Sequence, residues 1–307
     1  VNSVFGSDWT LKHIMLPLGI SFFTFQQISF VVDSFNGEVR DCSLLDYACF
    51  VTFFPQLIAG PIVTHDELVP QLQDDSKKRF SWENFSRGIY IFTLGLAKKV
   101  LIADNLSKAV TMGYSYVAAG NWDAMNSTSC LAVMLSYTLQ MYFDFSGYSD
   151  MAIGLGRMFN IDIPQNFNSP YKAVTILDHW KRTFAFINLG FIIFRAESLS
   201  QAFAVISQIF RFDFGSVDSA ICSGFQLTEV MLPLSKLPFI GRFVYWPPMM
   251  MVLFLAVSMF IVLVPKNAYE KMQELRPRPV PMLLTAALLV WCIFSFGTVS
   301  AFLYFNF

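Results

Sequence analysis

The sequence predicts an all-α fold, a polytopic bundle of transmembrane helices that includes re-entrant or broken helices. Hydrophobic residues make up 55% of the 307 residues and charged residues only 14%, against roughly 25% charged residues in an ordinary soluble domain. Long apolar stretches alternate with short polar loops, and two aspartates stand inside one of the apolar stretches. A soluble chain of this length needs more polar residues to cover its surface, so these observations favour a membrane protein.

Seven apolar segments are candidate spans. Most are long enough to cross ~30 Å of hydrocarbon at a rise of ~1.5 Å per residue. The 34 phenylalanines suit lipid-facing and helix-packing surfaces, and Trp and Tyr gather toward segment ends, as an interfacial belt requires. The segments run over residues 14–35, 44–63, 88–112, 129–156, 184–210, 246–265 and 280–305.

Two of these segments are irregular. The segment 88–112 carries Lys98 and Lys99 after ten apolar residues, which favours a re-entrant or interfacial helix over a plain span. The stretch 53–61 has two prolines and a glycine, so a helix breaks there. Backbone groups freed by such a break need partners, and the stretch is therefore expected inside the protein or along a cavity.

Charge patterning predicts orientation and excludes some partners. Basic residues gather at 77–87 and 266–278, and by the positive-inside rule both loops are expected in the cytoplasm. The net charge of -1 gives no reason to expect a nucleic-acid partner. No basic leader or cleavage site precedes the first apolar segment, so we expect no signal peptide and a start downstream of the natural N-terminus. Five cysteines without a CxxC spacing are expected as small buried apolar residues.

The aspartates Asp144 and Asp150 stand in the second half of the segment 129–156. A carboxylate at membrane depth costs at least a few kcal/mol unless it faces a polar cavity, a partner or a substrate path. Six residues on an unbroken helix leave the two side chains roughly 120° apart. They would therefore share a face only if the helix broke at Gly147.

Familiar catalytic and metal-binding motifs are absent from the sequence. There is no GxSxG, P-loop or HExxH pattern, and the three histidines lie far apart, so no metal site is expected. His13 and His65 are expected at interfaces or in loops. His179, beside Asp178 in a basic loop, is a weak catalytic candidate, against the simpler interpretation of a solvated histidine.

Several blocks of the chain resemble the membrane-bound O-acyltransferases, and most closely the branch that O-acetylates alginate in bacteria. The branch that transfers D-alanine to teichoic acids is more distant. The matching blocks are spread along the chain from residue 17 to residue 307, and the longest is highly specific. They are PLGISFFTFQQISFVVD at 17–33, FFPQLIAGPIV at 53–63, LGLAKKVLIADNL at 94–106, QMYFDFSGYSDMAIGLGRMFNIDIPQNFNSPY at 140–171, NLGFIIFRAESLSQAF at 188–203 and FLYFNF at 302–307.

The resemblance implies a multi-pass protein of the bacterial inner membrane that carries an acyl group across the bilayer through a tunnel with a histidine at its centre. A periplasmic acetyltransferase subunit would complete transfer to an exported polysaccharide such as alginate, so the acceptor is reached indirectly. Membrane lipid surrounds the protein. The resemblance implies no bound cofactor, and the acyl donor, an acyl-CoA or an acyl carrier, stays open.

The chain departs from the family pattern after Thr183. Residues 178–183 resemble the start of the family block D-F-W-R-R-W-H, but the chain then passes directly to Phe184. The missing stretch holds a histidine in that block and the catalytic histidine of a G-L-W-H-G motif. His179 aligns with the phenylalanine of the block and takes no family role. Only 11 uncharged residues follow before Arg195, or ~17 Å of helix where ~30 Å is needed.

We therefore expect an internal deletion after Thr183. It divides the chain into an N-terminal part of the acyltransferase core, 1–183, and C-terminal transmembrane helices, 184–307. By resemblance, eight polar residues line or brace the acyl path, with the two asparagines at its mouth. The alternative is that they hydrogen-bond between helices and hold the fold. They are Gln140, Tyr142, Asp144, Ser146, Tyr148, Asp150, Asn166 and Asn168.

Two classes of function compete. The first is membrane-bound O-acyl transfer in polysaccharide O-acetylation, or D-alanyl transfer to teichoic acid, with a histidine that this chain must obtain from the missing segment. On that interpretation the chain as it stands is inactive. The second is a non-catalytic membrane scaffold or remnant. A secondary transporter is a weaker third interpretation, because no inverted repeat is visible.

Overall fold

The computed structural model describes residues 20–39, 42–56, 60–172, 187–238, 241–276 and 278–296. Every regular element within these ranges is helical, which confirms the all-α part of the predicted fold class. In chain order the elements are α2 (Ile20–Phe35), α3 (Leu44–Val51), η1 (Phe54–Gln56), α4 (His65–Gln73), α5 (Trp82–Ala97), η2 (Lys98–Ala103), α6 (Asp104–Ala118), α7 (Ser127–Met158), η3 (Pro170–Lys172), α9 (Ile187–Arg195), α10 (Leu199–Ile209), α11 (Ser219–Ser223), α12 (Thr228–Ser235), α13 (Gly241–Val244), α14 (Pro247–Leu263), α15 (Ala268–Glu274) and α16 (Pro279–Phe294).

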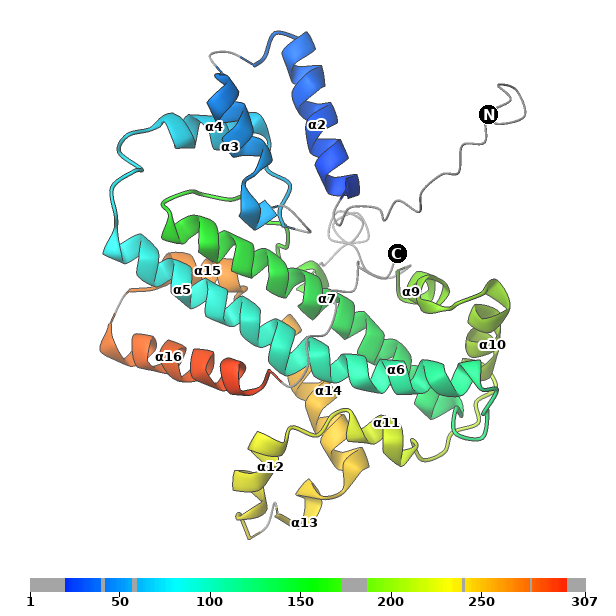
Figure 1. The fold of residues 1–307 in the computed structure, drawn as a ribbon. Helices are drawn as coiled ribbons and strands as arrows, with labels where there is room; N and C mark the ends of the chain where they lie inside the picture. The colour runs from blue at the N-terminus through cyan, green and yellow to red at the C-terminus, as the bar shows by residue number, and fades with distance from the viewer. Residues whose placement is uncertain are drawn as a thin grey trace, which may run out of the picture.

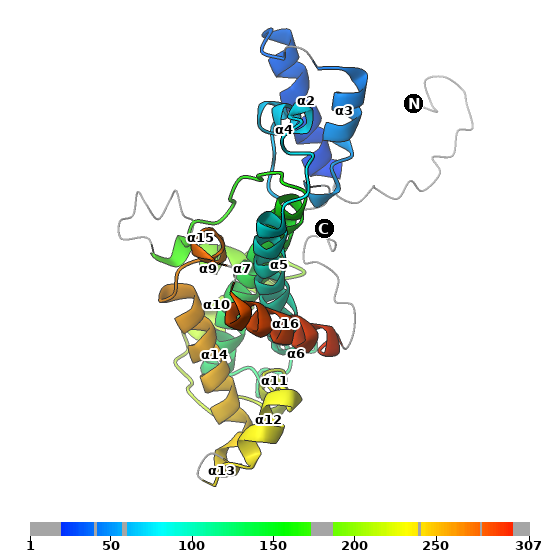
Figure 2. The same ribbon diagram turned by 90° about the vertical axis from the view of Figure 1, so that its left-hand side faces the viewer.

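Two long helices form the centre of the molecule. The run α5–η2–α6 is continuous from Trp82 to Ala118, and α7 lies alongside it (Figures 1 and 2). Asn126 starts α7, because its side chain accepts a hydrogen bond from the backbone N–H of Ser129. The 32 residues of α7 continue through Gly147 without a break.

The sequence predicts a re-entrant or interfacial helix at 88–112. The structure shows a helix that does not turn back there, while its place at a membrane interface stays a prediction. The helix continues through Lys98 and Lys99 as the π-helical turn η2 and then becomes α6. π turns inside α-helices are often found at functional sites. The helix can carry the two lysines through the bundle because both ammonium groups find carboxylates within it, as described below.

The predicted break at 53–61 is present. The segment expected to span 44–63 divides into the eight-residue α3, the short η1 and an irregular stretch that leads to α4. Pro55 and Pro61 are buried, as expected for a break packed inside protein, while residues 57–59 lie outside the described part of the chain. Thr64 then caps the N-terminus of α4, with its backbone N–H donating to the carboxylate of Glu67.

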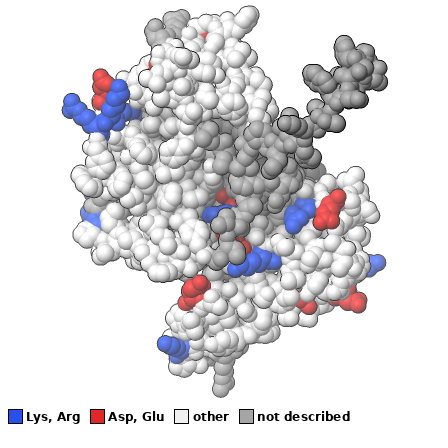
Figure 3. All heavy atoms as spheres, viewed as in Figure 1, with Lys and Arg blue, Asp and Glu red and all other residues white. Residues whose placement is uncertain are grey.

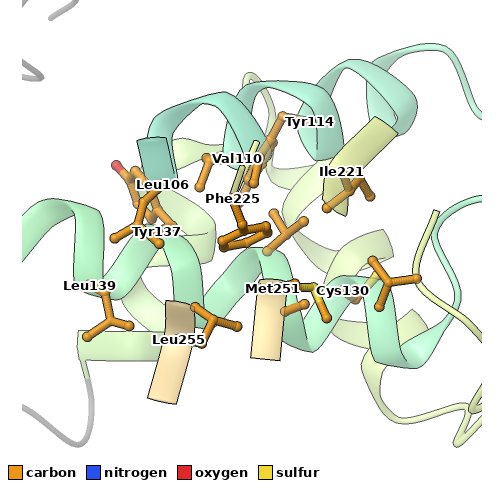
Figure 4. Packing of buried hydrophobic residues seen from close by; sticks show 14 of the residues in the cluster. Leu106, Val110, Tyr114, Cys130, Tyr137, Leu139, Ile221, Phe225, Met251 and Leu255 are labelled. Carbon is orange, nitrogen blue, oxygen red and sulfur yellow. The ribbon is translucent and has the colours of Figure 1, made fainter. Parts of the chain in front are cut away.

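The largest hydrophobic core lies where α6 and α7 meet α10, α11 and α14 (Figure 4). Leu106, Tyr137 and Ile221 are among its fully buried side chains. The view in Figure 4 places Met251 and Leu255 of α14 opposite the α6 side chains. The core therefore joins helices from both sides of the deletion predicted after Thr183.

The segment that follows α7 connects the two basic regions. Asn160 has a left-handed backbone (φ 63°) and its amide nitrogen donates to the backbone oxygens of Lys77 and Arg79. Farther along, Lys172 donates to the backbone oxygen of Pro265 at 2.6 Å. The segment is thus bonded to the basic region 77–87 and to the residue that precedes the basic region 266–278. The side of a membrane that the two regions face stays a prediction.

Large apolar side chains cover much of the surface of α2, α14 and α16. Phe25, Phe260 and Leu283 are each more than half exposed, and charged residues are sparse on the face seen in Figure 3. Among the described helices, none alone is long and apolar enough to cross a bilayer. Only α14 and α15 taken together pass that test, across a bend of 57°.

Candidate functional site

Buried ion pairs join η2 to α7. Lys98 Nζ lies 2.5 Å from Asp150 Oδ2, and Lys99 Nζ lies 2.6 Å from Asp144 Oδ1. Lys99 also pairs with Asp104, at 2.9 Å. Asp144 and Asp150 are 2% and 8% exposed, so the two lysines supply the charge partners that carboxylates require at such depth.

Gly147 explains why two carboxylates on different faces of α7 both find lysines. It lies three residues from each of them, so each carboxylate projects roughly 60° to one side of the glycine. At the glycine itself the helices touch: a Cβ added there would lie 2.7 Å from the backbone oxygen of Gly95 and 3.2 Å from Lys98 Cβ. The expected separation of the carboxylates is therefore correct, and each has its own lysine.

A cavity of about 490 Å³ opens beside this network. Its walls come from α5, η2, α7, α12, α14, α15 and α16, and most lining side chains are apolar. Lys98 and Tyr142 line it on the side of the ion pairs. Lys98 thus contacts both the cavity and Asp150, which connects the buried charge network to an accessible space.

Further polar groups of the cavity come from α15 and the segment before it. Lys266 pairs with Glu274. Lys271 has no hydrogen-bond or ion-pair partner among the described residues, and it lies in the basic region outside the predicted spans. Burial, with repulsion by Lys98 and Lys172, lowers the pKa of Lys271. The cavity therefore has an unneutralised cation in its wall.

The structure brings some of the eight predicted path residues together and separates others. Tyr142 is the one that lines the cavity, and its ring packs edge-on against Phe167 and Tyr171. Phe167 stands between Asn166 and Asn168, so the predicted wall and mouth meet at this aromatic cluster. Both asparagines are exposed.

The remaining predicted residues lie within or beside α7. Ser146 is fully buried, and Tyr148 is partly buried. The Oε1 atom of Gln140 is buried without a hydrogen-bond partner among the described residues. Asn166 donates to Ser149 Oγ at 3.2 Å, which fastens the exposed segment to α7. These positions suit bracing of the helices, and their role in an acyl path stays a prediction.

His65 is placed differently from the expectation of an interfacial or loop residue. It begins α4, is buried, and its Nδ1 lies 3.4 Å from Asp33 Oδ2. Ser29 donates to the same carboxylate oxygen at 3.2 Å, and Phe30 packs edge-on against the imidazole. The pair ties α2 to α4. Gln26, Ser29 and Asp33 of α2 are spaced so that they share one face of the helix, and this spacing was the signal that could have indicated an inward-facing Asp33.

The weak candidate His179, the junction at Thr183 and His13 all lie outside the described residues. Within the described ranges, His, Cys, Asp and Glu form no group of three or more that could hold a metal ion.

The sequence model of the membrane-bound O-acyltransferase family matches residues 33–186, half of the chain. The chain belongs to this family. The match contains the whole α5–η2–α6 run, α7 and both lysine–aspartate pairs, so the charge network described above is part of the family's own domain.

Curated relatives of this membrane-bound O-acyltransferase domain include acetyl- and alanyltransferases. A peptidoglycan O-acetyltransferase of Helicobacter pylori is 43% identical over 59% of this chain and 38% of its own length. A probable alginate O-acetylase AlgI of Pseudomonas aeruginosa is 41% identical over 57% of this chain and 32% of its own length. A teichoic acid D-alanyltransferase of Bacillus subtilis is 27% identical over 54% of this chain and 41% of its own length. The chain thus matches between about a third and two fifths of these relatives.

Proposed function

We propose that this chain is part of a bacterial inner-membrane O-acyltransferase that moves acetyl groups across the membrane for O-acetylation of an exported glycan. The observation that carries the proposal is the family match, together with relatives named as O-acetyltransferases at 41–43% identity. Both a peptidoglycan and an alginate enzyme are among them, so the acceptor proposed is an exported polysaccharide of either kind. D-alanyl transfer is the second candidate, at 27% identity.

In this proposal the described residues form the wall of the acyl path, and chemistry requires a histidine from a segment after Thr183. A positioned general base contributes roughly 10²–10⁴-fold to such a reaction. Tyr142 faces the cavity, where its hydroxyl can orient an acyl carbonyl or an acceptor hydroxyl. Asp144 and Asp150 hold the helices that form the wall by neutralising Lys99 and Lys98. The acyl donor is a thioester, on coenzyme A or on an acyl carrier, and a periplasmic acetyltransferase subunit completes the transfer.

Complementation tests this proposal. A strain that lacks the acetylation subunit receives the 307-residue chain, the chain with a family segment containing G-L-W-H-G inserted after Thr183, or the same insertion with its histidine replaced by alanine. We expect polysaccharide O-acetylation only from the second, with all three proteins present in the membrane. Acetylation by the chain without the insertion would contradict the need for that histidine. If none of the three proteins supported O-acetylation although all were present at normal abundance, the result would favour the non-catalytic scaffold.

A second test addresses the acyl path itself. In the active, inserted protein, Tyr142→Phe keeps the aromatic packing and removes the hydroxyl. A hydrogen bond contributes about 1 kcal/mol, so acetylation should fall about fivefold without loss of membrane abundance. Tyr116→Phe is the matched control, because its hydroxyl bonds to Asp218 at 3.0 Å and lies outside the cavity lining. Equal effects of the two changes would contradict a role for Tyr142 in the path.

A further inference from the structure

The far half of the cavity is not explained by acyl transfer. Beyond Lys98 and Tyr142 its walls are the apolar faces of α12, α14 and α16. Leu253 and Val257 of α14 line the cavity and are still 47% and 48% exposed. The cavity therefore opens past α14 onto a surface that is itself apolar, where Val252 and Phe260 are each 58% exposed.

Two polar groups of the cavity are hydrogen-bond donors that have no partner among the described residues. Lys271 is an ammonium without a partner among the described residues. Trp291 also lines the cavity, and its indole Nε1–H is buried with no acceptor in the described part of the chain. A buried donor left unpaired costs about 1–3 kcal/mol. A ligand that supplied acceptors and negative charge would remove this cost and neutralise Lys271.

Size and hydrophobicity narrow the class of ligand. A volume of about 490 Å³ lies within the range of ~300–1,000 Å³ that ligand sites span. Largely apolar walls exclude a small polar metabolite, since most of its polar atoms would lose their partners on burial. An amphiphile with an apolar chain and an anionic head satisfies both parts of the cavity.

We propose that the cavity between α12, α14, α15 and α16 binds an anionic membrane phospholipid. One acyl chain lies among the α12, α14 and α16 side chains, the phosphate pairs with Lys271, and Trp291 Nε1–H donates to an oxygen of the lipid. Lys271 lies in the basic region predicted to face the cytoplasm. Anionic headgroups of the cytoplasmic leaflet attract basic residues at that surface. The bound lipid fills the space between α14 and the α5–α7 pair and so supports the wall that carries Lys98 and Tyr142.

Lipid binding can be measured without acyl transfer. A negative result for lipid binding is therefore distinct from a negative result for the proposed acyltransferase activity. The 307-residue chain is purified in a neutral detergent and titrated with phosphatidylglycerol or with phosphatidylcholine of the same acyl chains, and bound lipid is counted by native mass spectrometry. We expect one phosphatidylglycerol per chain, bound at least fivefold more tightly than phosphatidylcholine. One lysine near a headgroup accounts for about that preference.

Three variants locate the site. Lys271→Gln should remove the preference for phosphatidylglycerol, and Lys271→Arg should keep it. Lys236→Gln is the matched control, because Lys236 is exposed and lies outside the cavity lining. Quenching of Trp291 by phosphatidylglycerol with brominated acyl chains, absent in Trp291→Phe, would place the lipid in the cavity.

Several outcomes would overturn the inference. Equal affinities for the two lipids, or an unchanged preference in Lys271→Gln, would exclude recognition of the phosphate at this place. Loss of the preference in Lys236→Gln would indicate adsorption to surface charge. Displacement of phosphatidylglycerol by micromolar acetyl-CoA, with no displacement by free acetate, would assign the cavity to the acyl donor in place of a lipid.

Discussion

The contact between α5 and α7 and the region formed by α12, α14 and α16 are both apolar for most of their length, yet they pack differently. Along the first, Gly88 and Gly95 of α5 lie against Gly154 and Gly147 of α7, so the two backbones touch. In the second, α14 leaves an open cavity on one side and exposed Val, Leu and Phe side chains on the other.

The difference lies in residue size and pairing. Small residues let helices approach closely, and close approach brings Lys98 and Lys99 within reach of the α7 carboxylates. Many bulky side chains on α14 and α16 are exposed and present surface that suits lipid. The α5–α7 contact therefore depends on individual atoms, while the α14–α16 region depends mainly on overall hydrophobicity. Substitutions should have large effects in the first region and small effects in the second.

The largest effect is expected from Lys99→Met in the α5–α7 contact. It leaves Asp144 buried without its cation, and breaking a buried pair by removing one partner costs about 3–5 kcal/mol. The additional change Asp144→Asn should recover most of the lost stability. Unfolding of the detergent-solubilised protein measures both. Lys78→Met is the control, because its pair with Asp75 is exposed and such surface pairs contribute little to stability. Similar losses of stability in Lys99→Met and Lys78→Met would mean that the buried pair stabilises the protein no more than an exposed pair does.

Gly147→Ala should have the next largest effect. The new methyl group would meet the backbone oxygen of Gly95, and the backbone cannot move aside as a side chain can. Overpacking of this kind costs about 1–3 kcal/mol, seen as a lower unfolding midpoint. The matched change Gly190→Ala has no atom within 4 Å of the added methyl and should be neutral or stabilising. Tolerance of alanine at Gly147 would show that the two helices are farther apart than described.

A smaller effect is expected where the second half of the chain contacts α6. The guanidinium carbon of Arg195 lies 4.8 Å from the centre of the Tyr114 ring. Arg195→Met removes this cation–π contact and should cost about 1 kcal/mol. Arg211→Met, at an exposed position, is the control. An unchanged unfolding midpoint in Arg195→Met would remove this contact from the interactions that hold α9 against α6.

The smallest effect belongs to the α14–α16 region. Leu284 of α16 is 67% exposed, so Leu284→Ala should change the stability of the detergent-solubilised protein by less than about 0.5 kcal/mol. Leu106→Ala, at a fully buried position of α6, should cost about 2–5 kcal/mol by the same assay. A large loss from Leu284→Ala would show that α16 is covered by protein in the molecule studied.

Local signals in the sequence were sufficient for several features. Hydropathy and length indicated helices throughout, and two prolines in 53–61 indicated the break after α3, because proline cannot continue a helix hydrogen-bond ladder. The specific block 140–171 indicated the family, which the family match confirms. The same signals could not place His65 beside Asp33. The two residues are 32 positions apart, with α3 and η1 between them, and no short sequence pattern predicts a contact over that distance.

The partners of the buried charges were beyond the reach of the sequence. From spacing alone, Asp144 and Asp150 stand on different sides of α7, and Lys98 and Lys99 interrupt an apolar segment. Each feature taken separately suggests a polar cavity or a helix that fails to span. Only the packing of η2 against α7 shows that the lysines and the aspartates form ion pairs and neutralise each other's charge.

The sequence by itself thus determined the helical class, the helix break at 53–61 and the family, because hydrophobicity, proline and a specific motif act over short stretches of chain. Only the tertiary structure decided which lysine pairs with which aspartate, that Tyr142 borders a cavity, and that Lys271 and Trp291 have donors to offer there. These features depend on how closely helices distant in the chain approach, and that distance is set by the glycines and bulky side chains of both partners together.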